Sequence, residues 1–332
     1  MATEIKSQAN SSGEPLEKDF SRDANHYRDG SNSYHVNDMS MGSDGASKKI
    51  RTDGSVSISP ELFEKMYLSP QNSVKGDLRK TFGNPTPVAI VGFLISLSPL
   101  SCDLMGWRGA GGGGAAGMYV LIILFHFSYL DIHLPVPSGA YFFFGGLLMV
   151  LGGFLEFILG NTFPFVVFIS FGAFWLTFAS TLQPAYYAYG LYAPDGGTPA
   201  DGLVTVGFNA SFGFFLVFMA VLCLIYLVCS LRTNVVFVVI FLTLVLGFSL
   251  LSAGYWHTAN SIGNKNAAEL ALAGRLQVAA GACLFVTSLA GWWIFFAIML
   301  AALDFPFQIP VGDLSTLIKG ASERQKSKEQ MA

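Results

Sequence analysis

Six long apolar segments, separated by short polar stretches, make up most of the chain after residue 86. The segments cover about 87–105, 139–159, 163–183, 205–230, 234–256 and 276–303. Each segment is long enough, as a helix, to cross roughly 30 Å of hydrocarbon. The pattern predicts an all-α membrane protein with six transmembrane helices and with both ends of the chain on one side of the membrane.

A seventh apolar run, at about residues 115–130, does not fit an arrangement of six spans with both ends of the chain on one side. If it crossed the membrane, the basic C-terminal end would move to the side opposite the basic N-terminal end, against the positive-inside rule. We therefore expect this run to be re-entrant, interfacial or loosely attached, and not to span.

Three ionisable residues at the end of this run are candidates for a metal site or a proton relay. Ionisable groups in membrane segments are functional by default, which draws attention to His126, Asp131 and His133. Their spacing fits no standard metal site. Pro135 and Pro137 follow at once, so Asp131 and His133 leave the apolar layer. We predict no metal site and no cofactor.

The two ends of the chain differ in composition from its middle. The first 83 residues are rich in Ser, Asn, Asp, Gly and Lys, a composition that buries too little apolar surface to offset chain entropy. We predict a disordered cytoplasmic N-terminal tail over 1–83 and a six-helix transmembrane domain over 84–304. The domain carries an inserted segment at about 115–136, and a cytoplasmic C-terminal tail covers 305–332.

Charge is concentrated at the two ends. Hydrophobic residues make up 52% of the chain and charged residues 12%, and only four of the 19 Lys and Arg residues lie between Asn84 and Thr316. The basic ends and Arg232 face the cytoplasm by the positive-inside rule, whereas Lys265 and Arg275 oppose that orientation. No set of nucleophile, base and oxyanion donors occurs in the apolar segments, so we expect neither enzyme activity nor a nucleic-acid partner.

The stretch Asn84-Pro85-Thr86-Pro87 marks the entry to the first apolar segment. Two prolines one residue apart fix φ twice and remove two N–H donors, so the chain enters the membrane through a short, rigid, non-helical mouth. The amide of Asn84 has two possible uses: it caps the helix, or it binds an ion or a carboxylate at a pore entrance.

Four glycines in the second segment form a repeated pair. Gly145 and Gly146 recur seven residues later as Gly152 and Gly153, which places both pairs on one face of a helix. Small residues let helix backbones approach closely in lipid. We predict that these glycines pack the second helix against its neighbours.

With these residues the chain resembles the acetate uptake transporter family, the succinate-acetate permeases of bacteria and fungi. Asn84-Pro85-Thr86-Pro87 with Gly92-Phe93 is similar to the family's Asn-Pro-Ala-Pro-Leu-Gly, with Thr86 in place of Ala and Val88-Ala89 in place of Leu-Gly. A second, more specific block consists of Gly145-Gly146, Gly153, Glu156, Gly160-Asn161-Thr162-Phe163, Ser170-Phe171-Gly172 and Phe174-Trp175-Leu176. The resemblance covers about 84–318, apart from 115–136. Agreement between the two blocks favours the pore-entrance role for Asn84.

The resemblance implies six helices in each protomer, a hexamer, and a pore through each protomer. It implies a small carboxylate substrate, chiefly acetate, with uptake linked to protons. It also implies a hydrophobic constriction formed by Phe93, Phe171 and Leu244. The middle position is usually tyrosine in the family, so Phe171 lacks a hydroxyl that would touch a passing carboxylate.

Glu156 lies near the cytoplasmic end of the second segment, where a carboxylate is costly unless it is hydrogen-bonded. Donors in the Asn161-Thr162 turn would satisfy it, and Asn161 also fits the start of the third helix. A structural role is favoured over proton coupling, because an acidic residue on the route would repel an anionic substrate.

The leading hypothesis is a plasma-membrane transporter or channel for acetate or a similar monocarboxylate, embedded in the lipid bilayer. Two alternatives remain: an exporter of ammonium or ammonia, and a non-transporting membrane sensor that works through its N-terminal tail. The 115–136 segment has two explanations as well: a lineage-specific insertion, or an intron read as coding sequence.

Overall fold

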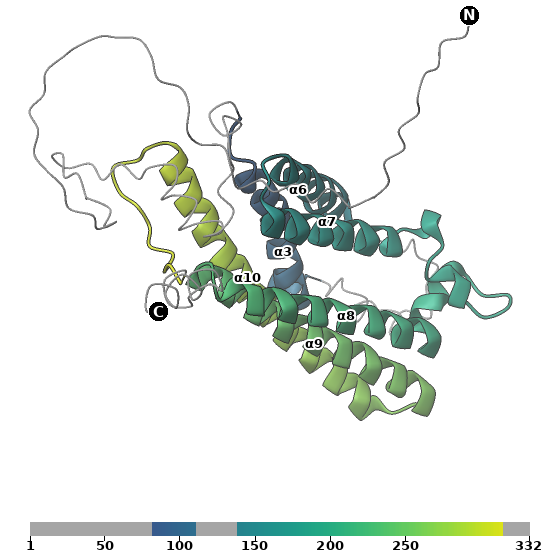
Figure 1. Cartoon of the computed structure of the whole chain (residues 1–332). Helices are drawn as coiled ribbons and strands as arrows, with labels where there is room; N and C mark the ends of the chain where they lie inside the picture. The colour runs from purple at the N-terminus through teal and green to yellow at the C-terminus, as the bar shows by residue number, and fades with distance from the viewer. Residues whose placement is uncertain (1–81, 111–137, 315–332) are drawn as a thin grey trace, which may run out of the picture. The chain divides into compact units, whose positions relative to one another are not determined.

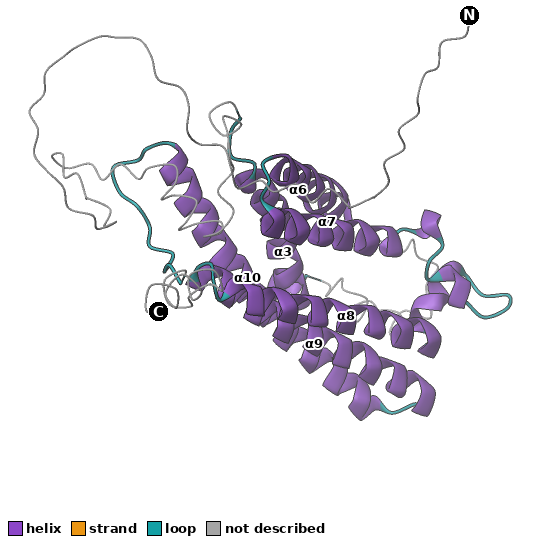
Figure 2. Ribbon diagram, viewed as in Figure 1, coloured by secondary structure: helices purple, strands orange, loops and turns teal. Residues whose placement is uncertain are grey.

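Every regular element of the described part of the chain is a helix (Figure 2). The computed structural model describes residues 82–110 and 138–314, all within one compact unit. The predictions for the N-terminal tail before residue 82, for the 115–130 run with His126, Asp131 and His133, and for residues 315–332 lie outside the described residues.

Six helices in the described ranges are long and apolar enough to cross a membrane, which confirms the prediction of an all-α membrane protein with six spans. They are α3 (Thr86–Leu104), η2 with α6 (Tyr141–Leu148 and Met149–Ile158), α7 (Thr162–Leu182), α8 (Val206–Ser230), α9 (Val235–Asn264) and α10 (Ala267–Ala302). The short elements are η1 (Trp107–Gly109), α5 (Ser138–Ala140), η3 (Pro184–Tyr186), η4 (Gly190–Tyr192) and η5 (Pro199–Val204).

The last two helices are longer than the apolar pattern predicts. The fifth helix continues to Asn264 and the sixth begins at Ala267. A turn of two residues therefore joins them, where the apolar pattern predicts a connection of about twenty residues. Lys265 takes a left-handed conformation at φ 50°, and the Asn266 side chain accepts a hydrogen bond from the N–H of Ala268. At 1.5 Å per residue, the 36 residues of α10 extend over about 54 Å. Hydropathy marks only the part of such a helix that lies in hydrocarbon.

The spans form two groups of three (Figure 1). In the first group, α3 and α7 both pack against the η2–α6 span; in the second, α9 packs between α8 and α10. The helices α3 and α10 join the groups, and they run antiparallel: a Cβ at Gly281 would touch Leu104, and one at Gly291 would touch Leu94. The N-terminal end of the first span and the C-terminal end of the last span therefore lie at the same end of the bundle.

The second span contacts its two neighbours through its glycines. A Cβ at Gly152 would lie 2.8 Å from the Cβ of Ala89 on α3, and one at Gly153 would lie 2.9 Å from Cγ1 of Ile169 on α7. Gly145 faces Trp175 and Gly146 faces Leu176 on α7. The first half of this span, Tyr141–Leu148, is a π-helix, a form that the seven-residue spacing did not predict.

Residues 310–314 fold back onto the connection between α8 and α9. The N–H of Val235 donates to the carbonyl of Gly312, and the N–H of Leu314 donates to that of Thr233. Trp293 donates its indole N–H to the carbonyl of Pro310 at 2.9 Å. The chain beyond α10 is therefore held against the end of the bundle as far as residue 314.

The close approach of α3 and the second span can be tested at Gly92. A Cβ at this position would lie 2.5 Å from the backbone oxygen of Phe144, so Gly92→Ala forces the two backbones apart. Overpacking of this kind costs roughly 1–3 kcal/mol. We expect a lower melting temperature of the purified protein in detergent and a smaller yield of folded protein.

Gly274→Ala is the matched control, because Gly274 lies in α10 and none of the described residues comes within 4 Å of a Cβ placed there. This change removes backbone entropy from the unfolded chain and adds about 0.5–1 kcal/mol of stability. Equal melting temperatures for the two variants would contradict the packing described here.

Candidate functional site

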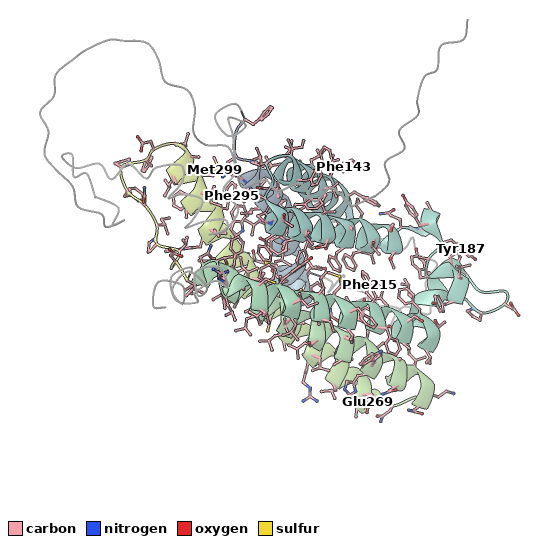
Figure 3. All side chains as sticks on the ribbon, in the orientation of Figure 1. Phe143, Tyr187, Phe215, Glu269, Phe295 and Met299 are labelled. Carbon is pink, nitrogen blue, oxygen red and sulfur yellow. The ribbon has the colours of Figure 1, made fainter. Side chains whose placement is uncertain are left out.

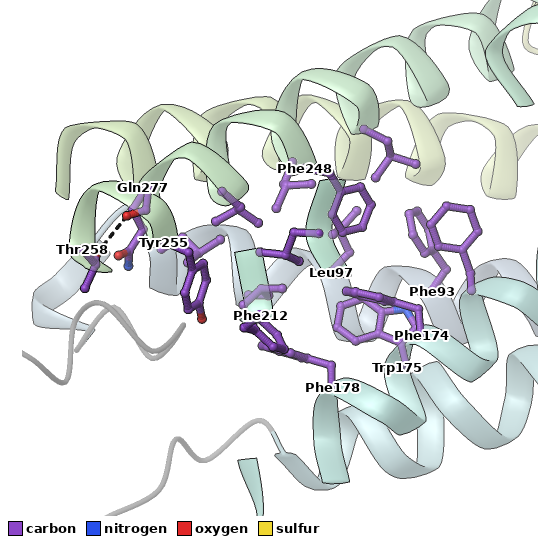
Figure 4. A pocket seen from close by; sticks show the side chains of 18 of the residues that line it. Phe93, Leu97, Phe174, Trp175, Phe178, Phe212, Phe248, Tyr255, Thr258 and Gln277 are labelled. Atoms are coloured by element: carbon purple, nitrogen blue, oxygen red, sulfur yellow. Dashed lines mark hydrogen bonds between the residues drawn. The ribbon is translucent and has the colours of Figure 1, made fainter. Parts of the chain in front are cut away.

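Of three cavities in the described part of the chain, the largest lies between the two groups of helices. It encloses about 720 Å³ of empty space, part of which is open to solvent, and is lined by residues of α3, α7, α8, α9 and α10. Figure 4 shows it from close by, with Phe93 at one end and Thr258 and Gln277 at the other. Most of its wall is leucine and phenylalanine, so it suits a small molecule with an apolar part.

A second cavity, of about 420 Å³, lies between α3, α6, α7, α9 and α10. The two cavities share three lining residues, Phe93, Phe171 and Leu244. The rings of Phe93 and Phe171 meet edge to face with centroids 5.9 Å apart. All three side chains are buried, and together they form the wall between the cavities.

A third cavity, of about 270 Å³, continues in the same direction. It shares Val167, Phe168, Phe237 and Phe241 with the second cavity, and it reaches Phe163 and Pro164 in the first turn of α7. The largest cavity instead reaches Thr258 near the end of α9 and Ala273 near the start of α10. The three cavities thus follow one another from one end of the bundle toward the other.

No charged residue lines any of these three cavities in the described part of the chain. The polar lining residues of the largest cavity are Trp175, Tyr255, Thr258 and Gln277. Thr258 donates its hydroxyl hydrogen to the carbonyl of Gly254 in its own helix. An ion that crossed this interior would find no counter-charge on the lining residues.

Aromatic side chains connect α7 with α8 across the interior. Phe174 stacks on Phe215 with centroids 5.9 Å apart, and Phe178 lies 6.3 Å from Phe212. Figure 3 shows Phe215 between the two helices. Large rings at these positions keep the helix backbones apart, and the cavity occupies the space that results.

Tyr226 of α8 brings a hydroxyl close to the constriction. Its ring lies 6.3 Å from that of Phe171, and its hydroxyl is 2.9 Å from that of Ser170. Phe171 itself has no hydroxyl, so the nearest phenol comes from another helix. This contact could not be predicted, because Tyr226 lies in an uninterrupted apolar run of the sequence.

Glu156 is fully buried and hydrogen-bonded at the end of the second span. Thr86 donates its hydroxyl hydrogen to one carboxylate oxygen, and Asn161 donates from its side-chain amide to the other at 2.6 Å. The N–H of Asn161 also donates to the backbone carbonyl of Glu156. The cluster ties together α3, α6 and the start of α7, and its residues line none of the three cavities.

Asn84 and Thr162 lie near this cluster in the sequence but on the exposed surface. The side-chain oxygen of Asn84 accepts a hydrogen bond from the N–H of Thr86 at 3.0 Å. The N-cap position of α3 is Pro85, which has no side-chain cap bond. Thr162 is the first residue of α7, and Asn161 is its N-cap position without a side-chain cap bond. Asn161 uses its amide on Glu156 instead.

Trp175 is a site residue that sequence reasoning named only as part of a motif. Its side chain is 1% exposed and lines the largest cavity. Its indole nitrogen has no hydrogen-bond partner among the described residues. In the sequence, only the motif Phe174-Trp175-Leu176 draws attention to Trp175. This motif does not indicate that the indole N–H lacks a partner.

Comparison with known proteins agrees with the motifs. The model of the GPR1/FUN34/yaaH family matches residues 113–316, a range that begins after the Asn84–Pro87 motif. Protein alcS of Aspergillus fumigatus is 44% identical over 79% of this chain and 86% of its own length. Acetate transporter protein patA of Aspergillus clavatus is 30% identical over 71% of this chain and 80% of its own length.

Two further matches are more distant. Ammonia transport outward protein 2 of Saccharomyces cerevisiae is 26% identical over 65% of this chain and 70% of its own length. A solved structure of the bacterial acetate channel SatP is 22% identical to this chain and covers 70% of this chain and 99% of its own length, with a TM-score of 0.43. By the family match and the identity to alcS, this chain belongs to the GPR1/FUN34/yaaH family.

Proposed function

We propose that this chain is a membrane transporter or channel for acetate or a similar small monocarboxylate. The observation that carries the proposal is the wall of Phe93, Phe171 and Leu244 between two cavities in a six-span bundle. Family membership supports it, as do the names of the relatives called acetate transporter protein patA and acetate permease A. The same family membership supports a role in transport over a role in catalysis.

A hydrophobic wall suits a small carboxylate for a physical reason. An apolar constriction dewets the route and makes the passage of a fully hydrated ion expensive. Acetate carries a methyl group that tolerates contact with Phe93 and Phe171, and protonation lowers the barrier further. Transport linked to protons is therefore part of the proposal.

The charges and the family resemblance support a proposal for the membrane arrangement. Arg232 lies at the end of the bundle where the first span begins and the last span ends, and the positive-inside rule puts this end in the cytoplasm. We infer that both termini are cytoplasmic, that the membrane is the plasma membrane, and that protomers assemble as hexamers. Asn84 lies at this same end, where it would flank the entrance to the smaller cavities.

Ammonia export is the second candidate. It is favoured by the similarity to ammonia transport outward protein 2 and by the absence of a hydroxyl at Phe171. A non-transporting sensor is the third candidate, and it would depend on the N-terminal tail. Transport that persists after deletion of residues 1–75 would argue against the sensor.

Uptake of labelled acetate into vesicles tests the main proposal. With the purified protein in the membrane, we expect uptake above that of protein-free vesicles, and a larger rate at acidic than at neutral pH. Ammonia release is measured in the same host cells for comparison. Uptake that equals the protein-free rate at every pH would refute the acetate proposal, and ammonia release alone would favour the second candidate.

The constriction predicts a change in substrate range for Phe93→Ala. Removal of this ring opens the wall between the two cavities, so carboxylates with three or four carbons should enter faster relative to acetate. Competition of these acids with labelled acetate measures the shift. Phe218→Ala is the control, because Phe218 lies on α8 with 69% of its side chain exposed; an equal shift in this variant would exclude a special role for Phe93.

Glu156→Gln separates the structural role of Glu156 from proton coupling. The neutral side chain weakens the bonds with Thr86 and Asn161, and we expect a loss of roughly 1–3 kcal/mol in stability. The pH dependence of acetate uptake should stay as in the unmodified protein. Thr86→Ala removes one donor from the same carboxylate and should destabilise less. A flat pH profile in Glu156→Gln alone would establish the coupling role instead.

A further inference from the structure

Three aromatic side chains line the third cavity where α7 and α9 begin. Phe163 lies in the first turn of α7, and Phe237 and Phe241 lie in the first two turns of α9. The rings of Phe163 and Phe241 meet edge to face with centroids 6.3 Å apart, and the ring of Phe237 stacks on that of Phe241 at 6.4 Å. These three residues, the inner aromatic group, connect the two helices across the proposed route.

Tyr226 of α8 supports the inner aromatic group from a third helix. Its ring lies 5.5 Å from that of Phe241 and 6.1 Å from that of Phe163. Its hydroxyl is 2.9 Å from that of Ser170 on α7, which fixes the direction of the ring. Tyr226 lines none of the three cavities. It therefore positions the two phenylalanine rings without contacting a molecule in the route.

Hydrogen bonds fix the end of α7 that carries Phe163. Asn161, the N-cap residue of α7, donates its side-chain amide to the carboxylate of Glu156 at 2.6 Å. The N–H of Asn161 donates to the backbone carbonyl of Glu156 at 2.9 Å. Because Phe163 is only two residues further along, its position depends on the end of the second span.

The start of α9 is fixed by the C-terminal strap, which consists of residues 310–314. The N–H of Leu314 donates to the carbonyl of Thr233 at 3.0 Å, and the N–H of Val235 donates to that of Gly312 at 2.8 Å. These bonds join the strap to the residues just before the first turn of α9 and to its first residue. Release of the strap would therefore free the helix end that carries two of the three rings.

We propose that the inner aromatic group is a second constriction of the transport route and that the C-terminal strap keeps it closed. This inference rests on the proposed function and adds to it. The wall of Phe93, Phe171 and Leu244 borders the second cavity, and the inner aromatic group borders the third. The lining residues of both cavities are apolar throughout.

Two constrictions in series have a physical consequence that one constriction lacks. Each apolar constriction dewets the route and excludes hydrated ions. The second and third cavities between them form a compartment that a small carboxylate can enter through one constriction while the other stays closed. Release of the strap opens the compartment toward the side of the membrane where α7 and α9 begin.

Labelling of a cysteine inside the compartment tests the second constriction. Val167 lines both the second and the third cavity, so Val167→Cys is placed in a background in which the four native cysteines are alanine. The probe is a charged, membrane-impermeant methanethiosulfonate. It is added to the side from which Thr162→Cys is labelled, because Thr162 is the exposed first residue of α7. We expect slow labelling of Val167→Cys; labelling as fast as that of Thr162→Cys would overturn the proposal.

Phe163→Ala opens the constriction on the α7 side. Its ring loses two aromatic neighbours, and labelling of Val167→Cys should become roughly 2- to 10-fold faster, the equivalent of one aromatic pair. Phe165→Ala is the control, because Phe165 lies in the same turn but its ring contacts Phe157 of α6 and lines none of the cavities. Equal labelling rates in the two variants would contradict a constriction at Phe163.

Leu314→Pro tests the strap. Proline has no N–H, so the bond to the carbonyl of Thr233 is lost. Labelling of Val167→Cys should become roughly 2- to 10-fold faster, as expected for the loss of one hydrogen bond. Leu314→Ala is the matched control, since it shortens the same side chain but keeps the donor. A strap without influence on the constriction would give equal rates in the two variants.

Acetate uptake by the same proteins separates this inference from the proposed function. If the unmodified protein takes up no acetate but the labelling rates change as described, the proposed function fails and closure of the compartment stands. If acetate is taken up, but Phe163→Ala and Leu314→Pro are labelled no faster than their controls, the second constriction fails alone. If Phe163→Ala does not fold, Phe237→Ala replaces it, because Phe237 lines the same cavity.

Discussion

Close approach between α3 and the second span is the contact on which the rest of the interior depends. Apolar side chains gain little from each other in lipid, so helices associate where small residues let their backbones come together. Gly92 and Gly152 supply such places. Phe93 follows Gly92 directly, so the same contact sets the position of the ring in the constriction, and it brings Thr86 to Glu156 at the end of the pair.

On the other side of the interior, large aromatic rings separate the helices. Between α7 and α8, rings such as Phe174 and Phe215 fill the space and hold the helices apart. Small residues on one side and large rings on the other leave a series of cavities instead of a uniformly filled core. The buried carboxylate of Glu156 is hydrogen-bonded at the end of the second span and lines none of the three cavities.

The number of spans and their helical class could be predicted from the sequence, because hydropathy reports directly which segments tolerate hydrocarbon. The ends of α9 and α10 could not, since polar residues such as Asn260 and Asn264 continue a helix once it leaves the lipid. The π-helix at Tyr141–Leu148 depends on packing against two neighbours, which no local pattern contains.

The candidate site, too, could be predicted from the sequence only in part. Phe93, Phe171 and Leu244 were named through family resemblance, because a chain with 30 phenylalanines does not single out two of them. Of the two partners of Glu156, Asn161 lies five residues away in the sequence and was predicted, whereas Thr86 lies 70 residues away and was not. An unpaired donor such as that of Trp175 is a property of three-dimensional surroundings and leaves no mark in the sequence.

The bridge at residues 312–314 has a consequence for the order of assembly. Val235 is the first residue of α9, and its N–H is one of the first-turn donors that a helix cannot satisfy by itself. Its acceptor, the carbonyl of Gly312, is synthesised after all six spans. The start of α9 therefore receives this bond only when translation of the membrane domain is complete, and chains that end before residue 312 leave that donor to water or lipid headgroups.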